Sequence, residues 1–408
     1  MAQVIPSFSR DGFLFQRTDV VTIVKKAGEK RLGLIINPVA GLGGRVGLKG
    51  SDGAEIQRRA LALGAVPRSQ ERAIQALERL EPADGFELVT CPSEMGADAA
   101  RACGFAPVVI GTARPGGTTA QDTITAAREM ARLGVDLLLF AGGDGTARDI
   151  YSAVAEKLPV LGIPAGVKIH SAVFGANPGS AGALAAAYLR GSVTTLREAE
   201  VMDLDEAAFR RGIVSARLCG YLRIPFQQRF LPGLKTPTTP GERTAQRAIA
   251  AAVVDGMEAG LLYIIGPGTT TRSIADRLGV EKTLIGVDVV ADGQLVAADV
   301  NESQLLALLE GRRAKIIVTP IGGQGYILGR GNQQISPRVI ERVGVDGEHA
   351  RENIIVVSTS GKIHSLGGRP LLVDTGDARV DEMLAGYVRV ITGYDEQIVY
   401  QVTNGGDQ

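Results

Sequence analysis

Short apolar runs alternate with segments of helical periodicity through the first half of the chain. Five runs of strand length are LGLII (32–36), FELVT (86–90), PVVIG (107–111), DLLLF (136–140) and PVLGI (159–163). Apolar residues spaced three and four apart predict helices between them, at 55–63, 69–80, 95–103, 119–134 and after Gly145. Continuous apolar strands that alternate with helices are typical of a parallel sheet covered on both faces. The pattern therefore predicts an α/β fold for residues 31–190.

The pattern changes near residue 195. The segments TLREAEVMDLDEAAF (195–209) and GIVSARLCGYLRIPF (212–226) hold more β-branched and alternating positions and lack long helices between them, which favours an antiparallel β region. The segment FLPGLKTPTTPGE (230–242) is rich in Pro, Gly and Thr and predicts an exposed loop or lid. Strand and helix patterns then return in LLYII, TLIGVDVV, NESQLLALLEG, AKIIVTP and NIIVVST. These segments predict a second α/β portion.

The length of the chain supports a division into two domains. A chain of 408 residues is too long for one compact core. We place an α/β domain at residues 1–195, in which residues 1–30 form an N-terminal extension. A β-rich domain with an additional α/β portion is expected at residues 196–408.

Composition and charge narrow the class of protein. The chain has 44 Lys and Arg against 44 Asp and Glu, so no charge excess indicates a nucleic-acid or acidic-membrane partner. Its three cysteines are far apart and form neither a disulfide framework nor a zinc signature. The start of the chain lacks the pattern of a signal peptide, and the longest apolar runs are only strand-sized. We expect a cytoplasmic protein with no nucleic-acid and no membrane partner.

A glycine-rich segment follows the fourth apolar run and carries the clearest chemical signal. Its residues are Gly142, Gly143, Asp144, Gly145 and Thr146. Glycines allow the backbone to approach a phosphate, and the N-terminus of the following helix supplies unpaired N–H groups. A carboxylate repels phosphate, so Asp144 should face a hydroxyl proton or a metal, as phosphoryl transfer requires. An ordinary strand–turn–helix junction is the alternative interpretation.

Two further loops of small residues fall at the same edge of the predicted sheet, because the carboxyl ends of parallel strands meet there. Asn37, Pro38 and Gly41 follow the first strand. A segment from Pro164 through Gly166 follows the fifth strand and leads to three candidate acceptor-binding residues, namely Lys168, His170 and Ser171. A hydrogen-bonded structural role is the alternative for His170. The three loops together favour a phosphate site over a chance turn.

Other polar loops are candidates for binding an acceptor molecule. Thr118, Thr119 and Asp122 lie at the same edge, although the threonines could equally cap the next helix. In the second half of the chain the candidates are Gly268, Thr269, Thr270, Arg272 and Gln324. Polar side chains at a helix N-terminus can bind an anion, and an N-capped turn is the alternative. Asp203 and Asp205 could join a metal shell but are more often solvated acids, so the metal ligands stay unassigned.

These motifs, in this order, resemble the ATP-NAD kinase superfamily, which also includes diacylglycerol and sphingosine kinases. The resemblance is carried by Asn37-Pro38-x-x-Gly41, by the GGDGT segment at 142–146 and by Pro164-x-Gly166. It is strongest to the AcoX-like branch, named after a protein of acetoin-catabolism gene clusters. Four segments resemble that branch: GVKIHSAVF (166–174), EAEVMDLDE (198–206), GPGTTTRSIAD (266–276) and TPIGGQGYILGRGNQQISP (319–337). The resemblance covers nearly everything from about residue 31 to the end.

The resemblance implies an NAD kinase-like fold, with an N-terminal parallel-sheet nucleotide-binding domain, a β-rich second domain and a site in the cleft between them. It implies ATP, or polyphosphate in some members, as donor, Mg2+ as the cation, and a homo-oligomer. By resemblance Asp144 is the catalytic residue, acting on the acceptor hydroxyl or through the metal. Asn37, Pro38, Gly41 and Gly166, with the glycines and threonine around Asp144, would bind the nucleotide phosphates.

One departure from the family leaves the acceptor open. NAD kinases carry an Asn-Glu/Asp pair for the nicotinamide ribose, and this chain has no secure equivalent at the expected place. Asn301-Glu302 has the right residue types but lies late, within the second α/β portion. We expect a kinase that phosphorylates a hydroxyl of NAD or of a small hydroxylated metabolite. The alternatives are a non-catalytic nucleotide-binding regulator and a diacylglycerol-like lipid kinase.

Overall fold

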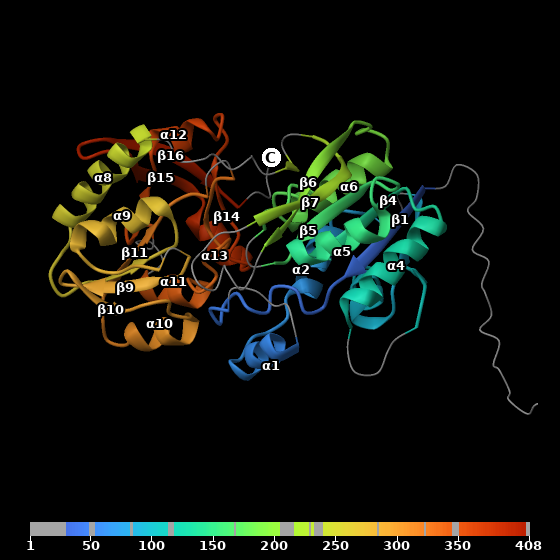
Figure 1. Cartoon of the computed structure of the whole chain (residues 1–408), viewed down its shortest axis with the longest axis horizontal. Helices are drawn as coiled ribbons and strands as arrows, with labels where there is room; N and C mark the ends of the chain where they lie inside the picture. The colour runs from blue at the N-terminus through green and yellow to red at the C-terminus, as the bar shows by residue number, and fades with distance from the viewer. Residues whose placement is uncertain are drawn as a thin grey trace, which may run out of the picture.

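The computed structural model describes residues 30–48, 54–81, 85–112, 118–166, 169–204, 216–227, 230–231, 240–283, 285–321, 324–344 and 351–404. Two domains lie side by side along the long axis of the molecule (Figure 1). Each is built around its own sheet, and a two-stranded hairpin is attached to the first. The predicted α/β fold, with an N-terminal parallel sheet and a β-rich second domain, is confirmed.

The first domain contains a five-stranded parallel sheet in the order β3-β2-β1-β4-β5. Its strands are β1 (Lys30–Ile36), β2 (Phe86–Thr90), β3 (Val108–Val109), β4 (Leu137–Gly142) and β5 (Val160–Pro164). Its helices are α1 (Ala54–Ala62), α2 (Ser69–Leu77), the 3-10 helix η2 (Ser93–Met95), α3 (Ala97–Ala102), α4 (Ala120–Arg132), α5 (Asp144–Val154) and α6 (Pro178–Leu189). All five strands were predicted. Strand β3 is shorter than expected because it lies at the edge of the sheet, where Val109 is exposed.

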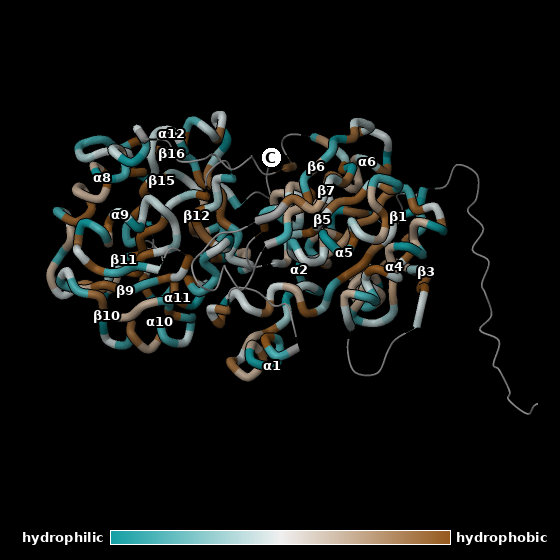
Figure 2. Tube along the Cα trace, viewed as in Figure 1, coloured by the Kyte–Doolittle hydropathy of each residue, from teal (hydrophilic) through white to brown (hydrophobic). Residues whose placement is uncertain are grey.

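Burial on both faces explains why the central strands are continuously apolar. Every residue of β4 is buried, and β1 is buried after its first residue. Their side chains alternate between the two sheet faces, and helices α2, α4, α5 and α6 pack against these strands. Figure 2 shows the centre of this sheet in the brown of hydrophobic residues. The antiparallel hairpin of β6 (Leu196–Leu204) and β7 (Ala216–Pro225) was also predicted. Its Val201 and Leu222 join the same core, which therefore extends beyond residue 195.

The second domain contains a nine-stranded mixed sheet in the order β10-β9-β8-β11-β13-β15-β16-β14-β12. Its strands are β8 (Leu262–Ile265), β9 (Asp288–Ala291), β10 (Gln294–Ala297), β11 (Ala314–Val318), β12 (Tyr326–Leu328), β13 (Ile354–Val357), β14 (Leu371–Val373), β15 (Gly386–Ile391) and β16 (Gln397–Thr403). Its helices are α8 (Pro240–Asp255), α9 (Thr269–Leu278), α10 (Glu302–Leu308), α11 (Pro337–Val343), α12 (Ser360–His364) and α13 (Ala378–Leu384).

Strand β8 shows how this sheet has a core on each face. Leu262 and Ile264 contribute to one cluster of buried apolar side chains, while Tyr263 and Ile265 contribute to another. Neighbouring β11 and β13 run parallel to β8, so their carboxyl ends meet at one edge of the sheet. Among the described residues, no helix combines the length and the apolar character needed to cross a bilayer.

Candidate active site

The three small-residue loops of the first domain meet at the carboxyl edge of its sheet. Strands β1 and β4 are adjacent although β2 and β3 separate them in sequence, so the strand order reverses between them. In open α/β sheets, ligands bind just outside such a reversal. Asn37 follows β1 and donates its backbone N–H to the carbonyl of Ala141, 3.0 Å away in β4. The first and second loops therefore begin side by side.

Close backbone contacts hold the loops together. The Asn37 side chain donates from Nδ2 to the Thr146 hydroxyl over 3.0 Å. Gly41 has a φ of +80°, and a Cβ there would lie 2.0 Å from the carbonyl oxygen of Ala165. A Cβ on Gly166 would lie 2.9 Å from the Cα of Gly143. Side chains are therefore excluded at these positions, and the three loops pack backbone against backbone.

Asp144 is the first residue of α5, which begins two residues earlier than predicted, so that Gly145 lies within its first turn. The side chain is buried, and both carboxylate oxygens accept backbone hydrogen bonds. Oδ2 accepts from the N–H of His170 over 2.8 Å, and Oδ1 accepts from the N–H of Ser171 over 2.9 Å. These two bonds fix the orientation of the carboxylate beside the N–H groups of the helix start.

The segment after β5 thus contributes backbone groups where the sequence indicated side chains. His170 and Ser171 hold Asp144 through their N–H groups. The Ser171 hydroxyl accepts from the N–H of Met202 over 3.0 Å and so ties this segment to β6. Acceptor binding by the two side chains stays a prediction. Lys168, the third candidate of this segment, lies outside the described residues.

No preformed metal cage exists in the described part of the chain, where no three His, Cys, Asp or Glu side chains come together to hold an ion. Asp203 forms an ion pair with Arg148, at 2.8 Å, and Asp205 is not among the described residues. Mg2+ in phosphoryl-transfer sites is commonly held by one or two carboxylates and the substrate phosphates. Asp144 fits the role of a single protein ligand of that kind.

The polar residues at the start of α4 have a structural role. Thr119 and Asp122 form a capping box, in which Asp122 Oδ2 accepts from the Thr119 N–H over 2.9 Å. Thr118 precedes this cap. Helix α4 follows the edge strand β3, which is two strands away from β1. These residues lie at the predicted edge of the sheet, but away from the reversal point.

The second-domain candidates gather around the start of α9, apart from Gln324, which lies in the turn before β12. Gly268 is the N-cap of α9, and Thr269 and Arg272 are exposed. Thr270 is fully buried, and its hydroxyl accepts from Nζ of Lys362 over 2.9 Å. The sequence did not indicate Lys362. The only signal was its position shortly after the apolar run NIIVVST, in a strand–loop–helix unit.

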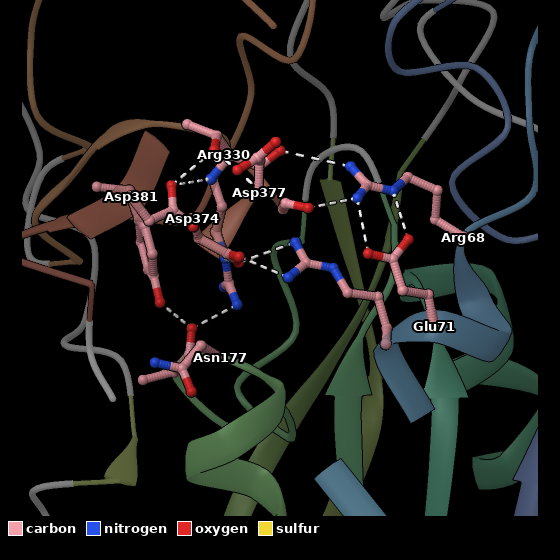
Figure 3. A network of polar contacts seen from close by, with 12 residues as sticks. Arg68, Glu71, Asn177, Arg330, Asp374, Asp377 and Asp381 are labelled. Carbon is pink, nitrogen blue, oxygen red and sulfur yellow. Dashed lines mark hydrogen bonds and ion pairs between the residues drawn. The ribbon is translucent and has the colours of Figure 1, made fainter. Parts of the chain in front are cut away.

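A buried polar network joins the two domains (Figure 3). Arg72 of α2 makes a two-pronged ion pair with Asp374, which follows β14, at 2.5 and 3.0 Å. The Tyr326 hydroxyl and the Arg330 guanidinium both donate to the carbonyl of Ala176. Burial alone would lower the pKa of Arg72, but the Asp374 carboxylate raises it, and the net shift is upward.

The same interface brings second-domain residues to the first glycine loop. A Cβ on Gly44 would lie 3.4 Å from the Cβ of Gln333, in the loop after β12. The N–H of Glu302 donates to the carbonyl of Arg45 over 3.1 Å. Asn301 caps α10, and Glu302 accepts from the Ser336 hydroxyl, so this pair serves structural contacts.

Two family models match the chain, one in each domain. The model of the ATP-NAD kinase N-terminal domain matches residues 32–193, and the model of the ATP-NAD kinase C-terminal domain matches residues 258–402. Together they cover about three quarters of the chain, in the order that the family has. The comparison with curated proteins finds no match.

Among solved structures, two from Bacillus anthracis are similar to part of the chain, one titled a putative diacylglycerol kinase and the other a diacylglycerol kinase. The first is 17% identical, and its match covers 45% of this chain and 46% of the other protein's chain. Its TM-score is 0.22. The other is 18% identical, and its match covers 45% of this chain and 48% of the other protein's chain. Its TM-score is also 0.22. The chain thus spans about half the length of these structures. A likeness of this size carries no argument about fold or function.

Proposed function

Because this chain belongs to the ATP-NAD kinase family, we propose that it transfers the γ-phosphoryl group of ATP to a hydroxyl of a small molecule. The observation that carries this proposal is the geometry of Asp144. Its carboxylate is held by two backbone N–H groups at the strand-order reversal, directly beside the glycine loops. A turn that served only to connect β4 to α5 would not require a buried carboxylate at this place.

In the proposed reaction, Asp144 orients the acceptor hydroxyl and accepts its proton as the hydroxyl oxygen attacks the γ-phosphorus of ATP, whose bond to the bridging oxygen breaks so that ADP leaves. The backbone N–H groups at the start of α5 and in the loop at Gly41 face the transferring phosphoryl group and stabilise its charge. Mg2+, brought in with ATP, supplies further neutralisation of the phosphate charge. The fixed carboxylate removes the need to reorganise the site during the reaction.

The proposal extends to the branch and the acceptor. The segments that resemble the AcoX-like branch support placing the chain there. NAD and a small hydroxylated metabolite are both proposed acceptors, since Asn301 and Glu302 make structural contacts in place of the family's ribose-binding pair. Assembly as a homo-oligomer is proposed on the family resemblance alone.

The test is an ATP-consumption assay with the purified protein and Mg2+. NAD and a panel of small hydroxylated metabolites are offered as acceptors, and the products are identified by mass. NADP would identify NAD as the acceptor, and a phosphorylated metabolite without NADP would identify a small-molecule kinase. If ATP binds but no acceptor is phosphorylated, the proposal is overturned in favour of a nucleotide-binding regulator.

A further inference from the structure

A second set of polar loops lies at the carboxyl edge of the second sheet. Strands β8, β11 and β13 are neighbours and parallel, so the loops that follow them meet at this edge. The first loop leads into α9 through Gly268, the second contains Thr319, and the third leads into α12 through Thr359. A Cβ on Gly268 would lie 2.6 Å from Cγ2 of Thr319, so the first two loops are in contact.

Lys362 brings a positive charge to this edge without a carboxylate partner among the described residues. Its ammonium group donates to the Thr270 hydroxyl over 2.9 Å, which uses one of its three donors. Glu242 of α8 accepts instead from the Thr359 hydroxyl over 3.0 Å. Burial lowers the pKa of Lys362, while the nearby Glu242 opposes that shift. Lys362 is half-buried, and an ammonium group that is partly removed from water gains from an anion beside it.

Thr319 supplies a second, independent indication of a ligand. Its side chain is only 8% exposed, yet its hydroxyl has no hydrogen-bond partner among the described residues. Buried hydroxyls are usually paired, and an unpaired one costs free energy. The first-turn N–H groups of α9 have no partner within the helix, and their N-cap, Gly268, has no side chain to offer them.

We propose that this edge binds an oxyanion, the phosphate or carboxylate group of the acceptor, between Lys362, Thr319 and the first turn of α9. Only the identification of the ligand as the acceptor rests on the proposed function. The donors are one cation, one hydroxyl and the helix N–H groups, a combination that suits phosphate well. The Lys362 ammonium group would repel a cationic ligand group, and a neutral one would gain less from its charge.

A short loop connects this site to the first domain. Gln333 lies against Gly44 of the first glycine loop. Ile335 lies close to Gly266, where an added Cβ would be 3.8 Å from the Cδ1 of Ile335. The two residues are separated by one residue, so their Cα atoms are at most about 7 Å apart. An acceptor anchored at Lys362 by its anionic group would thus be held on the side of the second domain that contacts the glycine loops.

The first experiment measures anion binding without any turnover. The thermal unfolding midpoint is followed as inorganic phosphate replaces chloride at constant ionic strength, with and without a saturating non-hydrolysable ATP analogue. We expect phosphate to raise the unfolding midpoint of the wild-type protein. In Lys362→Met, the phosphate concentration needed for the same rise should be about tenfold higher. Lys315→Met, which removes a lysine paired with Glu258 in the same sheet, should leave the response unchanged. An unchanged response in Lys362→Met would overturn the site.

Thr319→Val separates binding from folding. It removes a hydroxyl that has no partner, so the variant without phosphate should unfold no earlier than the wild type. The phosphate concentration needed to raise its unfolding midpoint as much as that of the wild type should still be about tenfold higher. A normal phosphate response in this variant would remove Thr319 from the site and overturn the proposal as stated.

Kinetics then test whether the oxyanion belongs to the acceptor. In Lys362→Met, KM for the acceptor should rise at least about tenfold, with kcat and ATP binding retained. An unchanged KM would overturn the acceptor assignment. If the phosphate response depends on Lys362 but no acceptor is phosphorylated, the anion site stands and the proposed kinase activity fails. The two failures are therefore distinguishable.

Discussion

The ion pair between Arg72 and Asp374 gives a quantitative test of how the domains are held together. Asp374→Asn keeps the shape of the side chain but removes its charge. Arg72 would then remain buried without an anionic partner, because its two bonds of 2.5 and 3.0 Å both go to Asp374. Arg330, whose Nε lies 3.9 Å from the same carboxylate, would lose its counter-charge as well. The change should therefore destabilise the folded protein.

The exposure of the pair sets the size of the effect. The Arg72 side chain is 14% exposed and that of Asp374 is 8% exposed, so water cannot replace the lost charge effectively. Breaking a buried ion pair by removing one partner costs about 3–5 kcal/mol. An asparagine oxygen can still accept one bond from the guanidinium, which places the expected loss near the lower end. We predict that the free energy of unfolding falls by about 3 kcal/mol.

Urea unfolding followed by circular dichroism measures this loss, because the chain has no tryptophan for fluorescence. Glu129→Gln is the matched control, since its ion pair with Arg132 is surface-exposed, with side chains 40% and 79% accessible. The control should lose no more than about 0.5 kcal/mol. The reasoning is refuted if Asp374→Asn loses less than about 1 kcal/mol, or no more than the control.

Two further predictions concern packing and chemical reactivity. Gly41→Ala should lower the unfolding midpoint more than Gly64→Ala, because both glycines have positive φ but only Gly41 has a neighbour in the way, 2.0 Å from the added Cβ. Equal midpoints would contradict the loop contact. Burial raises the pKa of the Cys91 thiol to about 12, so it stays protonated at pH 8 and should resist alkylation until the protein unfolds. Cys103 and Cys219 are partly exposed and should react before Cys91, and rapid labelling of native Cys91, mapped by mass spectrometry, would contradict this account.

Local patterns in the sequence were sufficient for the first sheet. Its strands are continuously apolar because both faces are buried, and this is visible without any knowledge of the partners. The cap at Thr119 was among the predicted alternatives because capping is a contact within one helical turn, which is also visible without knowledge of distant partners. Helix α8 was not predicted. It begins at Pro240, and proline suits the first turn of a helix as well as it suits a loop.

Contacts between distant segments could not be predicted. Arg72 and Asp374 are 302 residues apart, and Lys362 and Thr270 are 92 residues apart. A polar residue on a helix or in a loop looks solvent-exposed in sequence, and only the assembled fold shows that it is buried. The glycine loops did point to one edge of the sheet, because parallel strands bring their carboxyl ends together. The backbone bonds that hold Asp144 had no signal in the sequence.

The turnover of Asp144→Asn tests the central claim most directly. The variant is compared with the wild type and with Asp98→Asn, which changes an exposed aspartate of the same domain. ATP binding and turnover are measured on each protein with the acceptor found in the product assay. The account predicts that Asp144→Asn binds ATP normally while kcat falls about 10²- to 10⁴-fold, and that Asp98→Asn behaves as the wild type. Wild-type turnover in Asp144→Asn would contradict the assignment of the GGDGT carboxylate as the catalytic group.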